Sequence, residues 1–121
     1  MHDIIVNSKL EGSILLYDFQ KERYYSNDLV WAKKEFSPAS TFKIPNTIIG
    51  IETGVIGDTT IFKWDGQKRR MVDWEADLSL KDAFQKSCVP CYQDVARRIG
   101  YAEMKRYLGR FSYGAMEFSE E

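Results

Sequence analysis

Three helix signals follow one another from residue 79 to about residue 108, and they constrain the fold more than any other part of the sequence. Ser79 starts a capping-box pattern in which Asp82 replaces the usual glutamate, and a helix is predicted from there to about residue 86. Pro90 suits the first turn of a second helix, which Gly100 ends, and a third helix is predicted beyond it. Apolar residues recur at helical spacing along all three: Leu80, Ala83, Phe84, Tyr92, Val95, Ala96, Ile99, Met104, Tyr107 and Leu108.

The N-terminal part of the chain has a pattern typical of strands instead. Gly12–Phe19 is a short apolar run with β-branched and aromatic members, and it predicts a buried strand. After a polar turn over residues 20–22, Arg23–Ser26 is predicted to return as the second strand of a hairpin. Ile4–Val6 suits either a third strand or a short helix. A two-stranded ribbon is marginal alone, so it needs more sheet or a helix to cover it.

Between these regions one more helix is predicted. The S-P-A-S stretch at residues 37–40 signals its start, residues 41–53 form its body, and Gly54 ends it. Residues 55–77 are predicted to be rich in loops. Strands first and helices afterwards indicate the α+β class. A chain of 121 residues suits a single domain over residues 1–121, with a strand region at 1–30 and a mostly helical region at 31–121.

Composition excludes several classes of function. His2 is the only histidine and lies at a terminus, which excludes histidine-based triads, Cys-His pairs and His-rich metal sites, so no metal is expected. The net charge of −1 argues against a nucleic-acid partner. No apolar run is long enough to span a membrane, and the first residues lack the pattern of a signal peptide.

The S-T-F-K stretch at residues 40–43 is a candidate catalytic pair. Ser40 and Lys43 lie three residues apart and would share one helix face. At a helix N-terminus, backbone N–H groups can stabilise the oxyanion that forms when a serine attacks a carbonyl. Lys43, desolvated beside Phe42, could lose its charge and act as a base. Alone, the pattern more often marks a helix cap followed by a surface lysine.

A second candidate stretch, S-C-V-P-C at residues 87–91, allows two interpretations. Ser87 could relay protons to a leaving group, and Val89 could exclude water from a nearby lysine. Cys88 and Cys91 could instead form a redox pair, but such pairs follow a strand, and a helix is predicted before this stretch. The two cysteines are therefore predicted to be buried packing residues.

Taken in order, several stretches resemble the class D serine β-lactamases. Phe36–Asn46 resembles the nucleophile segment of that family, and Phe62–Gln67 resembles the loop that follows it. Trp74–Leu80 resembles the approach to the next helix, Ser87–Gln93 the second motif, and Phe111–Gly114 the start of the third. The resemblance covers most of the chain.

The resemblance implies roles for individual residues. Ser40 would be the nucleophile that opens a β-lactam ring through an acyl-enzyme, with half of the oxyanion hole at its own N–H. Lys43 would react with carbon dioxide or bicarbonate to form a carbamate that acts as general base, and no other cofactor is expected. Ser87 would pass a proton to the leaving nitrogen. The side chains implied to line the site are Phe42, Trp74, Val89 and Tyr113.

The sequence departs from the family after Gly114, where Ala115 follows instead of asparagine and no Lys-Thr-Gly strand is found. The resemblance thus implies a partial β-lactamase/transpeptidase-like fold, with an N-terminal β-hairpin and a helical region but without the C-terminal strands and helix, and a truncated chain of uncertain activity. Alternatives are a β-lactam-binding sensor-like domain, a fragment that pairs with another chain, a homo-oligomer or swapped assembly covering sheet edges, or a thiol–disulfide module. The family implies a periplasmic or secreted location.

Overall fold

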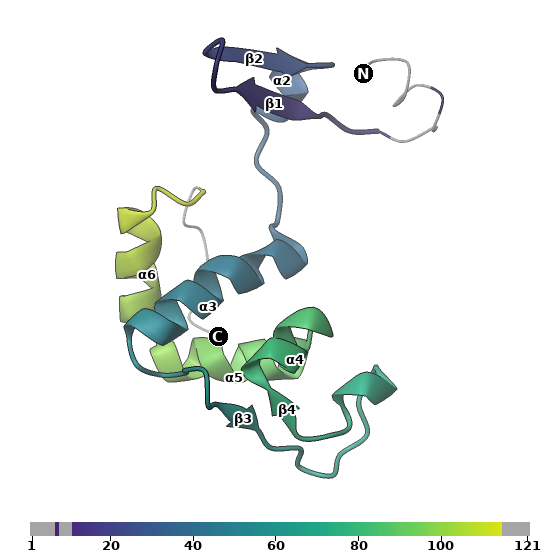
Figure 1. The fold of residues 1–121 in the computed structure, drawn as a ribbon, viewed down its shortest axis with the longest axis vertical. Helices are drawn as coiled ribbons and strands as arrows, with labels where there is room; N and C mark the ends of the chain where they lie inside the picture. Colours follow the sequence, from purple (N-terminus) through teal and green to yellow (C-terminus); the bar gives the residue numbers. More distant parts are fainter. Residues whose placement is uncertain (1–6, 8–10, 115–121) are drawn as a thin grey trace. The chain divides into compact units, whose positions relative to one another are not determined.

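A computed structural model describes Asn7 and residues 11–114, which fall into two compact units, Met1–Phe36 and Ser37–Glu121 (Figure 1). Each unit is considered by itself. The stretch Ile4–Val6, predicted as a strand or short helix, lies outside the described residues. That both units belong to one domain stays a prediction.

The first unit contains the predicted hairpin. Strand β1 (Leu15–Asp18) pairs antiparallel with β2 (Arg23–Ser26). The carboxylate of Asp18 accepts the backbone N–H groups of Gln20 and Lys21, each at 3.0 Å, and so fixes the polar turn. The prediction of the hairpin and its turn is therefore confirmed.

Burial of the first strand was predicted wrongly. Leu15, Leu16 and Tyr17 are 49%, 53% and 43% exposed. In the part of this unit that the structure describes, the ribbon is joined only by the four-residue helix α2 (Leu29–Ala32), which has no buried residue. A ribbon with so little beside it cannot remove its apolar side chains from water.

The second unit is a set of packed helices with a small two-stranded sheet at one edge (Figure 1). Helix α5 contacts both α3 and α6, and the two-stranded antiparallel sheet contacts α4. No helix among the described residues is long and apolar enough to cross a membrane. The prediction of the α+β class is confirmed. The elements are η1 (Ala39–Phe42), α3 (Lys43–Glu52), β3 (Ile61–Phe62), η2 (Val72–Trp74), β4 (Leu78–Ser79), α4 (Leu80–Gln85), α5 (Val89–Ile99) and α6 (Tyr101–Arg110).

The predicted start and stop signals of the three C-terminal helices are confirmed. Ser79 Oγ accepts the N–H of Asp82 at 3.1 Å, and the Asp82 carboxylate accepts the Ser79 N–H in return. Pro90 lies in the first turn of α5, and Gly100, with φ of +79°, separates α5 from α6. The core of the unit consists of Ile49, Ile56, Phe62, Leu78, Ala83, Cys88, Cys91, Tyr92, Val95, Ile99, Met104, Tyr107 and Leu108.

Candidate active site

Two consecutive helical segments position Ser40 and Lys43. Ser40 lies in the 3-10 helix η1, and Lys43 caps η1 and begins α3. The α-helix was predicted to begin near Ser40, and the structure moves that start to Lys43. Pro45 has no N–H to donate to the carbonyl of Thr41, and the chain before it winds as the tighter 3-10 turn. With three residues per turn, that geometry still places the side chains at 40 and 43 on one side.

Lys43 occupies an unusual environment for an amine. The residue is only 8% exposed, and burial lowers the pKa of Lys43 below its ordinary value of 10.5. Its Nζ lies 5.8 Å from the centre of the Tyr92 ring. None of the ion pairs formed by described residues includes Lys43. Burial therefore makes the neutral form of this amine, which is the nucleophilic and basic one, easier to reach than in an exposed lysine.

A polar network holds α3 on α5 beside this lysine. Thr47 Oγ1 donates to the Lys43 carbonyl at 2.7 Å and shares a hydrogen bond with the Tyr92 hydroxyl at 2.8 Å. Asn46 Nδ2 donates to the Tyr92 carbonyl at 3.1 Å. Burial raises the pKa of Tyr92, and the hydrogen bond with Thr47 opposes this shift. The sequence reasoning assigned Tyr92 to packing and missed this network, although Asn46 and Thr47 follow Lys43 at helical spacing.

Ser87 reaches the nucleophile candidate from a different part of the chain. Its Oγ donates to Ser40 Oγ at 3.2 Å, although 47 residues separate the two. Both sides of this contact carry backbone strain, because φ is +52° at Ser87 and +46° at Ala39, next to Ser40. Such left-handed conformations cost a non-glycine residue roughly 1–2 kcal/mol and gather at functional sites.

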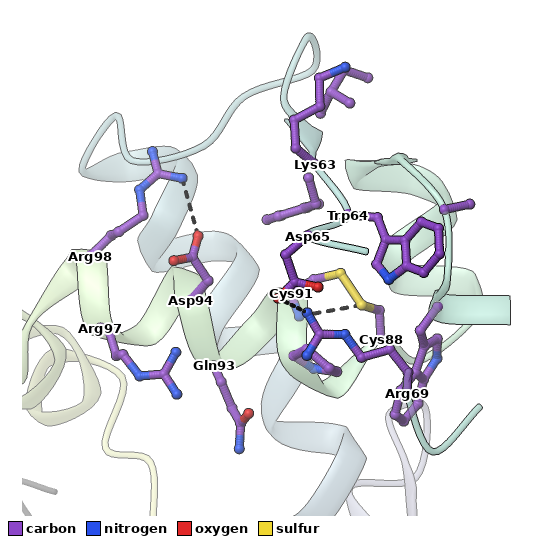
Figure 2. Close-up of a pocket in the computed structure, with 15 residues that line it drawn as sticks. Lys63, Trp64, Asp65, Arg69, Cys88, Cys91, Gln93, Asp94, Arg97 and Arg98 are labelled. Atoms are coloured by element: carbon purple, nitrogen blue, oxygen red, sulfur yellow. Dashed lines mark hydrogen bonds and ion pairs between the residues drawn. A yellow bond between two sulfur atoms is a disulfide. The ribbon is translucent and has the colours of Figure 1, made fainter. Parts of the chain in front are cut away.

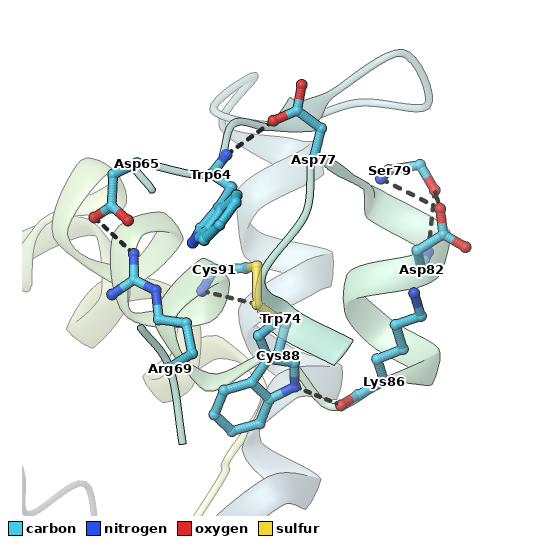
Figure 3. Close-up of a disulfide and its surroundings, with 10 residues drawn as sticks. All are labelled: Trp64, Asp65, Arg69, Trp74, Asp77, Ser79, Asp82, Lys86, Cys88 and Cys91. Carbon is cyan, nitrogen blue, oxygen red and sulfur yellow. Dashed lines mark hydrogen bonds and ion pairs between the residues drawn. A yellow bond between two sulfur atoms is a disulfide. The ribbon is translucent and has the colours of Figure 1, made fainter. Parts of the chain in front are cut away.

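The residues predicted to line the site lie in different places. Phe42 and Tyr113 meet edge to face, with ring centres 6.0 Å apart. Val89, the first residue of α5, is 41% exposed, and the Lys43 amine faces the ring of Tyr92. The Trp74 indole N–H donates to the carbonyl of Lys86 at 3.0 Å, which places it against the turn that carries Ser87 (Figure 3).

The two cysteines are joined, which corrects the prediction that they are separate packing residues. Cys88 and Cys91 are buried, as predicted, but form a disulfide at the start of α5 (Figure 3). Cys88 is the N-cap residue, and Pro90 places Cys91 in the first turn. This is the same N-cap to N3 relation that joins Ser79 and Asp82 at α4, so the helix start itself brings the two sulfurs together.

The arrangement suits nucleophilic catalysis. A serine hydroxyl lies within hydrogen-bond distance of a second hydroxyl, and a buried lysine with a lowered pKa follows it by three residues in the chain. Among the described residues, no group of three or more His, Cys, Asp or Glu side chains could hold a metal ion.

Comparison with known proteins identifies relatives of the chain. A sequence family described as "Penicillin binding protein transpeptidase domain" matches residues 4–121. The chain is 49% identical over 111 residues to Beta-lactamase OXA-11 of Pseudomonas aeruginosa, a match that covers 91% of this chain and 42% of that relative. It is 43% identical over 112 residues to Beta-lactamase OXA-48 of Klebsiella pneumoniae, covering 92% of this chain and 42% of that relative.

A solved class D β-lactamase structure is also similar to the chain. The crystal structure of FUS-1 (OXA-85), a class D β-lactamase from Fusobacterium nucleatum subsp. polymorphum, matches with a TM-score of 0.92 at 35% sequence identity. The match covers 98% of this chain and 50% of that one. The chain thus spans about two fifths of its curated relatives' length and half of this structure.

Proposed function

The chain belongs to the penicillin-binding protein transpeptidase family, on its class D β-lactamase branch, and from this premise we propose that it opens β-lactam rings through an acyl-enzyme on Ser40. The observation that carries the proposal is the hydrogen bond from Ser87 Oγ to Ser40 Oγ at 3.2 Å, with the buried Lys43 three residues after Ser40 in the chain. Because the chain spans only part of its relatives, its activity and its substrates belong to the proposal.

In the proposed acylation, Ser40 Oγ attacks the β-lactam carbonyl carbon while its proton passes to a base. The C–N bond of the ring then breaks, and the nitrogen takes up a proton. The contact of Ser87 with Ser40 Oγ supports Ser87 as the hydroxyl that delivers a proton to that nitrogen. The product is an ester on Ser40, which water cleaves to regenerate the hydroxyl.

Lys43 is the proposed base. Its burial, its lowered pKa and the lack of an ion-pair partner among the described residues fit an amine that reacts with carbon dioxide in its neutral form. Once bound, a carbamate would supply a general base of lower basicity than the amine. The polar contacts of Thr47 hold the start of α3 against Tyr92, and so keep the lysine in place.

A second candidate is a β-lactam-binding protein that acylates without turnover. The description of the matched family, a penicillin-binding transpeptidase domain, favours it, and the same Ser40 and Lys43 would form the adduct. We also propose a periplasmic or secreted location, and the Cys88–Cys91 disulfide supports an oxidising compartment.

Intact-mass spectrometry and a chromogenic β-lactam, with and without bicarbonate, test the proposal together. We expect an adduct on Ser40, faster colour development with bicarbonate, and no adduct in Ser40→Ala. Ser112→Ala, at an exposed serine of the same unit, is the matched control and should react like the parent. Ser87→Ala should slow acylation by roughly a hundredfold. A stable adduct without turnover favours the second candidate, and a folded chain that forms no adduct on Ser40 contradicts both.

A further inference from the structure

The Cys88–Cys91 disulfide lines a cavity of about 550 Å³ formed by α5 and the loop between β3 and β4 (Figure 2). Both cysteines are otherwise almost enclosed, with exposures of 1% for Cys88 and 9% for Cys91. Trp64, Trp74 and Pro90 contribute an apolar part to a lining that is otherwise mostly polar. The cavity is thus a route to the disulfide, and Cys91 is the more exposed of the two residues that form it.

The two sulfurs of this disulfide are not equivalent. Cys88 is the N-cap of the eleven-residue helix α5, and its Sγ accepts the backbone N–H of Cys91 at 3.3 Å. A thiolate released at Cys88 would keep this hydrogen bond and lie at the positive end of the helix dipole. A stabilised thiolate is a good leaving group in thiol–disulfide exchange. Accessibility and leaving-group quality thus both favour attack at Cys91.

The charges around the cavity favour an anionic ligand. Arg69 pairs with Asp65 at 2.7 Å, and Arg98 pairs with Asp94 at 3.6 Å, which neutralises both acidic residues that line it. Arg97 also lines the cavity, is exposed, and has no ion-pair partner among the described residues. Its guanidinium is therefore available to a carboxylate.

We propose that Cys88–Cys91 is a thiol–disulfide exchange site for small thiols that carry carboxylates. The thiolate of the incoming molecule attacks Cys91 Sγ, the bond between the two protein sulfurs breaks, and Cys88 leaves as a thiolate. The product is a mixed disulfide on Cys91. A second thiolate attacks the sulfur of the bound small molecule, releases it as a symmetric disulfide and leaves Cys91 as a thiolate. Two small thiols are oxidised and the protein disulfide is reduced by two electrons.

The site differs from the proposed hydrolytic one and can be tested without a β-lactam. The chain is incubated with glutathione, which carries carboxylates, or with cysteamine, which carries an amine, at equal thiolate concentrations and low salt. Acid quenching, alkylation and peptide mass spectrometry then locate the adduct. We expect a mixed disulfide on Cys91 rather than Cys88, formed about tenfold faster with glutathione than with cysteamine.

Arg97→Gln should bring the two thiols to nearly equal rates, while Arg110→Gln, at an exposed arginine that does not line the cavity, should keep the preference. Circular dichroism verifies that both variants are folded. The proposal is overturned if the disulfide opens only in denaturant, if the adduct forms on Cys88, or if glutathione holds no advantage that depends on Arg97.

Discussion

Gly50 allows α3 to pack closely against Ile56 and Val95. Replacing Gly50 therefore tests the packing that supports the candidate site. Gly50 is buried, and a Cβ at this position would lie 2.8 Å from Ile56 Cγ1, 2.9 Å from Ile56 Cδ1 and 3.1 Å from Val95 Cγ1. Ile56 cannot retreat freely, because its N–H donates to the Gly50 carbonyl at 3.0 Å. Both neighbouring side chains are in the core.

Two opposing free-energy terms decide the effect of Gly50→Ala. Alanine in a helix interior gains about 1 kcal/mol over glycine. Forcing a methyl group into a packed core costs about 1–3 kcal/mol. Contacts below 3.0 Å on two atoms of Ile56 place this site toward the upper part of that range. We therefore expect Gly50→Ala to lower the free energy of unfolding by about 1 kcal/mol.

Urea unfolding followed by far-UV circular dichroism measures this change. Gly57→Ala is the control, because a Cβ there meets nothing within 4 Å, and it should stay within about 0.5 kcal/mol of the parent. Ile56→Val removes Cδ1, so it should cost about 0.5–1 kcal/mol less in the Gly50→Ala background than in the parent. A Gly50→Ala chain that is more stable than the parent, with purely additive effects, would refute the reasoning.

Substitutions at three further positions test other features by urea unfolding. Lys43→Met should raise the free energy of unfolding at pH 6 in carbon-dioxide-free buffer, because burial lowers the pKa of Lys43 and the folded state disfavours its ammonium form. This gain should shrink as the pH rises toward 10.5, and a gain that stays constant with pH would contradict the account. Ser79→Ala should cost about 1 kcal/mol, and Ser79→Thr much less. The hydrogen bond from Ser79 is the largest cause of the lowered pKa of Asp82. The Ser79→Ala chain should therefore lose less stability than the parent chain when the pH falls below the ordinary carboxyl range. Tyr92→Phe should cost about 1 kcal/mol through the lost bond to Thr47, and an unchanged midpoint would show that this bond contributes nothing.

The helices of the second unit could be predicted because their signals are local. The pattern of Ser79 and Asp82, the proline at 90 and the glycine at 100 each act on the backbone within a turn or two. The pairing of β3 with β4 could not be predicted, because each strand is two residues long and shows no periodicity. Exposure of Leu15 was missed for another reason, since an apolar pattern shows which residues favour burial and not what covers them.

In the candidate site, too, the local relations could be predicted from the sequence and the long-range ones could not. The spacing of Ser40 and Lys43 suggested a shared side, but the contact of Ser40 with Ser87 was implied only by the family resemblance, since no local rule joins residues so far apart. The disulfide was missed because the usual context of a redox pair, a preceding strand, was required. Once Pro90 fixes the start of α5, the N-cap and N3 positions of Cys88 and Cys91 carry the signal.

The hydrogen bond between Ser40 and Ser87 has a consequence for partly folded states of the chain. It closes a loop of 47 residues, and the network between α3 and α5 holds its two ends in place. A compact acid state that keeps its helices but loses fixed side-chain packing would separate the two hydroxyls. Chemical labelling of Ser40 would then report tertiary order, and on acidification it should disappear before the far-UV helix signal does.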